Sequence, residues 1–286
     1  MPAGVAKNKV GWLEARLGAS SIVSATVFVL VALSTVSGCK YSAQKTLERA
    51  SAAREAGNYE EAASLYERYL QSDPSSSDSV EARLRLADLY NLNLHHYEQA
   101  LAEYTEVLNQ SPADQIAMAA RERMADVLTD LGRSFDAIAE YEKLNPTDET
   151  ERRRIRLRIA DLYFGQKNFS QALAEYTKVS DGVDYDDLSE QAYLREASIY
   201  QLERRQYQQA MPIYEKIVSS TSDQKVRRRA TFCIADCYAA LSEYDNAIKT
   251  LREVKDPAEQ SYVTSRITEL EQQSKEAARG TPLLRH

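Results

Sequence analysis

Small and apolar residues recur along this chain at steps of 35 to 38 residues. Each copy has an alanine, a large apolar residue four positions later and another apolar residue seven positions later. The alanines are Ala62, Ala100, Ala137, Ala172, Ala210 and Ala247, and the residues at +4 are Tyr66, Tyr104, Tyr141, Tyr176, Tyr214 and Leu251. Offsets of 0, 4 and 7 lie on one face of a helix, so the pattern predicts six amphipathic helices.

A second segment precedes each of these helices. Its copies read "RLADLY", "RMADVL", "RIADLY", "REASIY" and "CIADCY", with alanines at Ala87, Ala125, Ala160, Ala197 and Ala235 and with Ala50 in a degenerate first copy. Short turns with helix-stop and polar residues, such as "AGNY" and "LGRS", join the two segments. Repeats two and five carry one extra turn residue, in "NLNLHHY" and "QLERRQY". Each repeat is therefore predicted to contain two helices, here called helix A and helix B in chain order.

This pattern resembles the tetratricopeptide repeat, which has a small residue and an aromatic on helix A and A-x3-F/Y on helix B. The resemblance covers residues 43 to about 256 and implies an all-α, right-handed α-solenoid of about six helix pairs. Neighbouring pairs stack because a single pair cannot bury its own apolar stripe. We assign residues 39–256 to the solenoid, 257–278 to a capping helix anchored by Tyr262, Ile267 and Leu270, and 279–286 to a tail.

The first 38 residues have a different character. Lys7, Lys9 and Arg16 stand against one acid, Glu14, and the chain is then uncharged from residue 17 to residue 39. A basic start, an apolar centre and small residues before a break are typical of a signal peptide, here residues 1–38. An uncleaved transmembrane anchor is the alternative, because about 20 apolar residues can span a bilayer.

The sequence "VSGC" at residues 36–39 resembles the lipobox of bacterial lipoproteins. That resemblance implies that Cys39 carries a lipid and becomes the N-terminus after cleavage. Lys40 rather than Asp follows the cysteine, which in that family favours the periplasmic face of the outer membrane. With an uncleaved anchor, the protein would instead lie at the inner membrane.

Composition narrows the possible functions. The net charge of −7 argues against non-specific nucleic-acid binding. No phosphate-binding glycine loop and no catalytic arrangement of side chains is recognisable, so we expect no enzyme activity, no cofactor and no metal site. Cys233 and Cys237 are expected to be small core-facing residues, because helical Cβ directions suit a disulfide poorly. Most arginines in "ERRRIRLR" and "VRRRA" are expected to face solvent.

One set of charged residues keeps its place in successive A helices. The arginines are Arg85, Arg123, Arg158 and Arg195, and the acids three positions later are Asp88, Asp126 and Asp161, with Ser198 in the fourth copy. In tetratricopeptide domains these places face the concave groove, so the resemblance implies a ladder of alternating charges there. Three interpretations remain open: local pairs at i,i+3, contacts between repeats, and binding of a partner. In the partner interpretation, all seven charged residues bind the partner.

The combination of a lipobox with a short solenoid resembles the tetratricopeptide lipoproteins of outer-membrane β-barrel assembly, the BamD type. The resemblance implies a lipid-anchored periplasmic scaffold whose partners are envelope assembly components or extended peptide segments. A pilotin, a Tol-type envelope coordinator and an inner-membrane protein that assists secretion are the alternatives.

Overall fold

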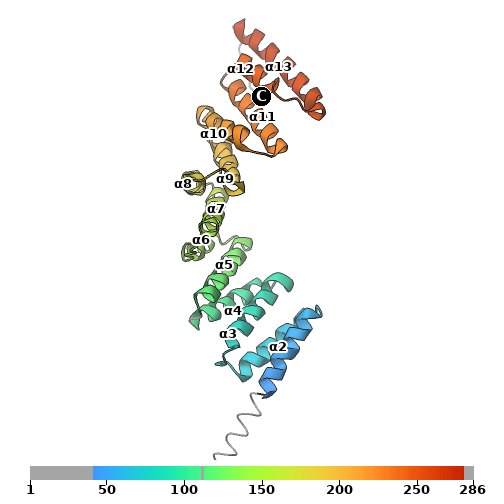
Figure 1. Cartoon of the computed structure of the whole chain (residues 1–286), viewed down its shortest axis with the longest axis vertical. Helices are drawn as coiled ribbons and strands as arrows, with labels where there is room; N and C mark the ends of the chain where they lie inside the picture. The colour runs from blue at the N-terminus through green and yellow to red at the C-terminus, as the bar shows by residue number, and fades with distance from the viewer. Residues whose placement is uncertain (1–40, 111–112, 280–286) are drawn as a thin grey trace, which may run out of the picture. The chain divides into compact units, whose positions relative to one another are not determined.

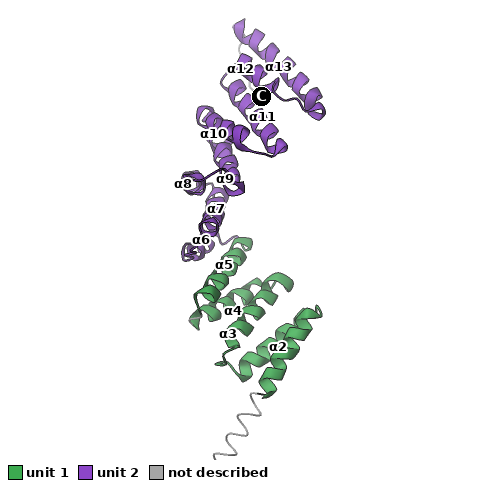
Figure 2. Cartoon of the chain, in the orientation of Figure 1, with its two compact units in different colours: residues 1–131 green, residues 132–286 purple. Residues whose placement is uncertain are grey.

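The computed structural model describes residues 41–110 and 113–279. These residues fold into helices and contain no strand. They form two compact units, residues 1–131 and 132–286 (Figure 2). The predicted signal peptide and Cys39 lie outside the described residues, as do most residues of the predicted tail.

The first unit begins with a helix over residues 41–55. It continues with α2 (Tyr59–Ser72), α3 (Ser79–Asp88), a π-helical turn η1 (Leu89–Asn93), α4 (Tyr97–Asn109) and α5 (Asp114–Asp130). Consecutive helices pack on one another, α2 on α3, α3 on α4 and α4 on α5 (Figure 1). The helix pattern predicted for repeats one and two, and helix A of repeat three, is confirmed here.

The second unit begins with α6 (Ser134–Glu142), which is helix B of repeat three in the sequence pattern. The elements that follow are α7 (Glu149–Gly165), α8 (Phe169–Ser180), α9 (Asp187–Ser198), a π-helical turn η2 (Ile199–Glu203), α10 (Tyr207–Ser220), α11 (Gln224–Ala240) and α12 (Tyr244–Leu251). The unit ends with a 3₁₀ turn η3 (Pro257–Glu259) and α13 (Gln260–Ala278). Each helix packs on the next along the chain (Figure 1).

The predicted core positions are confirmed. All six helix-B alanines are completely buried, and each helix-A alanine is at most 2% exposed. The residues four positions after the helix-B alanines, five tyrosines and Leu251, are at most 3% exposed. Alanine at a helix crossing lets the backbones approach closely, and the tyrosine rings fill the space on either side.

The extra residue in repeats two and five is accommodated inside helix A rather than in a longer turn. In η1 the amide of Leu94 donates to the carbonyl oxygen of Leu89 at 3.0 Å, and in η2 Arg204 donates to Ile199 at 3.0 Å. An i to i+5 bond adds one residue to a helical turn, so the turn widens and the chain stays in register. The widened turns leave Leu92 and Leu202 exposed, at 65% and 67%.

The turns between helices A and B share one backbone conformation. The second residue before helix B has a positive φ in every repeat; these residues are Gly57, His95, Gly132, Lys167, Arg205 and Ser242. This left-handed conformation ends helix A and reverses the chain. Nothing lies within 4 Å of a Cβ built on Gly57 or Gly132. The glycines are therefore favoured by their backbone angle and not by a lack of space.

The last helix, α13, covers the apolar face of α12. Leu270 and Val263 are its buried residues, at 1% and 4% exposure, and Ile267 packs beside them. Tyr262 does not anchor the helix as a buried residue: its side chain is 49% exposed, and its ring makes a T-shaped contact with Phe232 at 5.2 Å between centroids. It therefore lies at the edge of the core.

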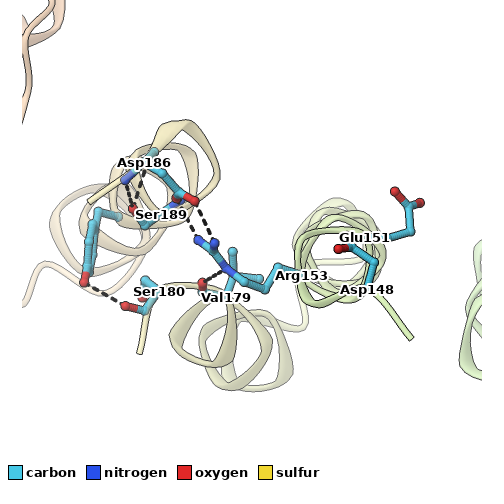
Figure 3. Close-up of polar contacts among 8 residues, drawn as sticks. Asp148, Glu151, Arg153, Val179, Ser180, Asp186 and Ser189 are labelled. Carbon is cyan, nitrogen blue, oxygen red and sulfur yellow. Dashed lines mark hydrogen bonds and ion pairs between the residues drawn. The ribbon is translucent and has the colours of Figure 1, made fainter. Parts of the chain in front are cut away.

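One of the arginines expected to face solvent is instead buried. Arg153 on α7 is 5% exposed, and its guanidinium binds both carboxylate oxygens of Asp186, at 2.6 and 2.7 Å. Its Nε donates to the carbonyl oxygen of Val179 at the end of α8, at 2.8 Å (Figure 3). Asp186 also caps α9 by accepting from the amide of Ser189. Arg153 thus connects the start of α7, the end of α8 and the start of α9.

Arg228 on α11 is the second exception and occupies the same repeat position as Arg153. It pairs with Asp256, which caps the 3₁₀ turn before α13, and with Glu259 at 3.4 Å. In both repeats the arginine lies seven residues before the helix-A alanine. It binds the acid that caps the second element along the chain, α9 for Arg153 and the turn before α13 for Arg228. We call this contact between an arginine and a capping acid a clamp. In the sequence, a clamp arginine cannot be told from a solvent-facing arginine unless the capping acid that it binds is also considered.

Candidate functional site: a polar groove across α7, α9 and α11

The charged ladder in the first unit connects one repeat with the next. Arg123 on α5 donates to Asp88 on α3 at 2.8 Å, and the hydroxyl of Tyr104 on α4 donates to the same carboxylate at 2.8 Å. Burial raises the pKa of Asp88, although the bonds from Tyr104 and Arg123 lower it. We call this unit of helix-A aspartate, helix-B tyrosine and next-repeat arginine a rung.

A second rung lies in the other unit. Asp161 on α7 accepts from Tyr176 on α8 at 2.5 Å and pairs with Arg195 on α9 at 3.5 Å. The Arg195 guanidinium also lies 5.7 Å from the ring centroid of Phe164. Burial and the charge of Asp161 raise the pKa of Tyr176, so its hydroxyl remains a proton donor. Both Asp161 and Arg195 are about half exposed, at 46% and 53%, so this rung faces solvent.

The other predicted ladder residues have individual surroundings. Arg85 on α3 pairs with Glu81 one turn earlier in its own helix. Arg158 on α7 donates to the hydroxyl of Tyr141 on α6 at 3.0 Å, and Asp126 lies half-buried on α5. Among the described contacts, Asp88 and Asp161 pair with the arginine of the following repeat. This geometry agrees with contacts between repeats; whether the seven residues also bind a partner stays a prediction.

The ladder is interrupted between repeats five and six. Ser198 stands at the aspartate place of α9, and Cys233 stands at the arginine place of α11. Tyr214 on α10, the tyrosine of this rung, donates to the Gln201 side chain at 2.8 Å instead. Ser198 turns its hydroxyl back to the carbonyl oxygen of Arg195 in its own helix, at 2.8 Å. Two small side chains therefore replace a long ion pair.

The ladder resumes one repeat later. Asp236 on α11 pairs with Arg266 on α13 at 3.3 Å, and Arg266 also binds Glu269 at 2.7 Å. The capping helix thus supplies an arginine to the last aspartate of the series, in the way that helix A of a following repeat would.

A cavity of about 430 Å³ opens at the missing rung. Its lining includes the rung places Asp161, Arg195, Ser198 and Cys233, together with the side chains Leu157, Gln191, Leu194, Gln201, Leu202, Tyr214, Arg229 and Asp236. Except for Tyr214, these residues come from α7, α9, η2 and α11, which are the A-helix elements of repeats four to six. A neighbouring hollow of about 610 Å³ shares Gln201, Leu202 and Asp236 and extends to α13. The two hollows lie side by side on these shared residues, and we call them together the groove.

Two cysteines lie in this region. Both are free; Cys237 is buried in the core and Cys233 lines the cavity. Burial raises the pKa of the Cys237 thiol to about 12 and also raises the pKa of Cys233. Among the described residues, no group of three or more His, Cys, Asp or Glu side chains could hold a metal ion. Within that same part of the chain, no helix has both the length and the apolar character to cross a bilayer.

Stacked helix pairs with small residues at their crossings define an α-solenoid, and comparison with known proteins identifies its repeats. Models of the tetratricopeptide repeat match residues 53–119 in the first unit and residues 195–268 in the second. The chain therefore contains tetratricopeptide repeats, as the sequence pattern predicted. No curated protein matches the chain in sequence.

Solved structures show the same fold at low sequence identity. The apo form of RapI is 14% identical, with a TM-score of 0.54, and the match covers 82% of this chain and 72% of that one. A signal-transduction ATPase with a tetratricopeptide repeat sensor from Pyrococcus horikoshii is 17% identical, with a TM-score of 0.51; the match covers 73% of this chain and 34% of that one. The C-terminal part of a repeat protein from Cytophaga hutchinsonii is 16% identical, with a TM-score of 0.50 and coverage of 83% and 100%.

The repeat pattern predicted the ladder but not the gap within it. Ser198 stood out only as a substitution, and Cys233 only as an expected core residue. Comparing the two places across successive repeats, rather than within one helix, would have shown that an arginine and its aspartate are absent together. Arg229 lies one turn before Cys233, outside the two ladder places, so the repeat pattern did not single it out.

Proposed function

We propose that this protein is a non-enzymatic scaffold that binds an extended segment of a partner protein in the groove across α7, α9 and α11. The observation that carries this proposal is the 430 Å³ cavity on the A helices, where polar, charged and apolar side chains alternate. Concave surfaces of helical repeats are the usual binding surfaces of solenoids. Cavities of a few hundred Å³ with a few convergent polar groups suit side chains of a ligand.

We further propose that the protein is anchored to the cell envelope through a lipid on Cys39, with the solenoid in the periplasm. The basic and apolar N-terminal segment followed by "VSGC" supports this proposal. A role in outer-membrane β-barrel assembly, of the BamD type, follows from the combination of lipobox and solenoid. A pilotin or a Tol-type coordinator shares that combination and is the alternative.

Site-specific cross-linking in the native envelope tests the groove. A photoreactive residue at Gln191, which lines the cavity, is compared with one at Gln208, which is exposed on α10 and lines neither cavity. We expect covalent products from position 191 only, and a β-barrel assembly subunit among them. A secretin or a Tol component instead would support the alternative. Equal products at both positions would contradict binding in the groove.

Labelling with a radioactive fatty acid tests the anchor. We expect the wild-type chain to incorporate the label and the Cys39→Ala variant to lose it, because thioether attachment needs the thiol. A variant that keeps the label, or a wild-type chain that never acquires it, would favour an uncleaved N-terminal anchor at the inner membrane. The groove experiment is independent of this result.

A further inference from the structure

The missing rung changes the charge of the groove as well as its volume. Arg195 and Asp161 pair with each other, and Asp236 pairs with Arg266, which also binds Glu269. Arg229 is exposed on α11, lines the same cavity and makes no ion pair or hydrogen bond within the part of the chain that the structure describes. Arg229 is therefore a positive charge without a direct partner, close to the place where the ladder lacks its aspartate.

The neighbouring groups fit a carboxylate better than a cation. Gln191 contributes a side-chain amide to the lining, and Arg195 contributes a second guanidinium. The hydroxyl groups of Ser198 and Tyr214 already donate to the Arg195 carbonyl oxygen and to Gln201. Burial raises the pKa of Cys233, so its thiol adds no negative charge that could compensate Arg229. Guanidinium groups bind carboxylates with geometric preference, often through two parallel hydrogen bonds.

Apolar side chains border the same cavity. Leu157 and Leu194 lie in its lining, and Leu202 on the π-helical turn is 67% exposed where the cavity meets the second hollow. A leucine exposed to this extent beside a charged cavity gains burial when an apolar side chain of a partner covers it. The groove therefore offers a charged position and an apolar position side by side.

From this arrangement we infer that the cavity binds an acidic side chain of an extended partner segment, which takes the place of the missing aspartate opposite Arg229. An apolar residue of the same segment packs against Leu202. This inference rests on the proposed function and specifies the chemistry of the partner: a protein segment with a glutamate or aspartate next to an apolar residue.

Peptide pools with one fixed position provide the test. The probes are fluorescein-labelled peptides of about nine residues, which extend over roughly 30 Å. Their central residue is Glu, Gln or Lys, and the other positions are degenerate. Binding to the purified full chain is measured by fluorescence anisotropy. We expect the Glu pool to bind about tenfold more tightly than the Gln pool, as one charge-assisted pair allows.

Two variants test whether Arg229 and the missing rung produce the preference for Glu. Arg229→Gln is expected to abolish the preference for Glu over Gln with little change in stability, because Arg229 makes no ion pair or hydrogen bond among the described residues. Arg252→Gln is the matched control; Arg252 is 67% exposed, and among the described residues its only ion pair is a 3.9 Å contact with Glu271. The double variant Ser198→Asp with Cys233→Arg restores the rung inside the chain. It is expected to fill the cavity and to lower binding of the Glu pool to that of the Gln pool.

The outcomes separate this inference from the proposed function. Binding of all three pools with equal affinity would overturn the acidic preference and leave the peptide-binding scaffold in place. No binding in any pool would contradict both. A preference for Glu that survives Arg229→Gln would show that another group binds the carboxylate. If the double variant does not fold, the Arg229→Gln comparison decides alone.

Discussion

The clamp formed by Arg153 permits a quantitative prediction. Replacing Arg153 by Met keeps most of the aliphatic side chain, so the packing of the stem against α7 and α8 is largely retained. The substitution removes three hydrogen bonds, two to the Asp186 carboxylate and one to the carbonyl oxygen of Val179. The free energy of unfolding then reports mainly on the lost polar contacts.

The magnitude follows from the exposure of each partner. Breaking a fully buried ion pair costs about 3–5 kcal/mol. Here the Asp186 side chain is 43% exposed and keeps its hydrogen bond from the Ser189 amide at 2.9 Å. Water can therefore hydrogen-bond the carboxylate in place of Arg153, which reduces the cost. We take about 2 kcal/mol for this pair and about 1 kcal/mol for the unsatisfied Val179 carbonyl, or about 3 kcal/mol together.

Urea unfolding followed by far-UV circular dichroism measures this change. Arg154→Met is the matched control on the same helix, because Arg154 is half exposed and, within the described part of the chain, pairs only with Glu151. It should cost less than about 0.5 kcal/mol. A difference between the two variants below about 1 kcal/mol would show that the clamp does not stabilise the fold as argued.

The pH dependence gives a second measurement of the same contact. The Arg153 guanidinium holds the pKa of Asp186 well below its usual range. A carboxyl group with a lowered pKa stabilises the folded state above its unfolded-state pKa, and this stabilisation is lost as the pH falls through the folded-state value. The wild-type chain should therefore lose more stability than Arg153→Met below about pH 4. Parallel curves would contradict the assignment.

Three further substitutions test the rung, the crossings and the turns. Burial raises the pKa of Asp88, so its charge adds little net stability at neutral pH. Asp88→Asn should change the free energy of unfolding by less than about 1 kcal/mol. As the pH rises above about 4, the stability of this variant should increase relative to that of the wild type. Ala160→Leu should cost about 1–3 kcal/mol because Ala160 is completely buried at a crossing, whereas Ala174→Leu on the exposed face of α8 should be nearly neutral. Lys167 has φ of 59°, so Lys167→Gly should raise the midpoint of urea unfolding by the equivalent of about 0.5–1 kcal/mol. An unchanged or lowered midpoint would contradict the argument from backbone strain.

The sequence alone determined the repeated helix pair. Alanine at two fixed places and a tyrosine four residues after the second are local signals, because offsets of 3, 4 and 7 define one face of a helix whatever surrounds it. Ala172 and Tyr176 are examples: both are completely buried, as the pattern required. The extra residue in repeats two and five was visible as well, although its accommodation in a π-helical turn was not.

Only the tertiary structure decided the roles of the charged residues. Arg153 and Arg154 are adjacent and chemically identical, yet one is buried against Asp186, 33 residues away, and the other faces solvent. Likewise, only the stacking of α9 and α11 shows that Ser198 and Cys233 line one cavity with Arg229. Helix formation depends on neighbours within one or two turns, whereas an ion pair between repeats depends on which carboxylate the stack brings within reach. Helical periodicity could therefore be read along the chain, and the partners of these side chains could not.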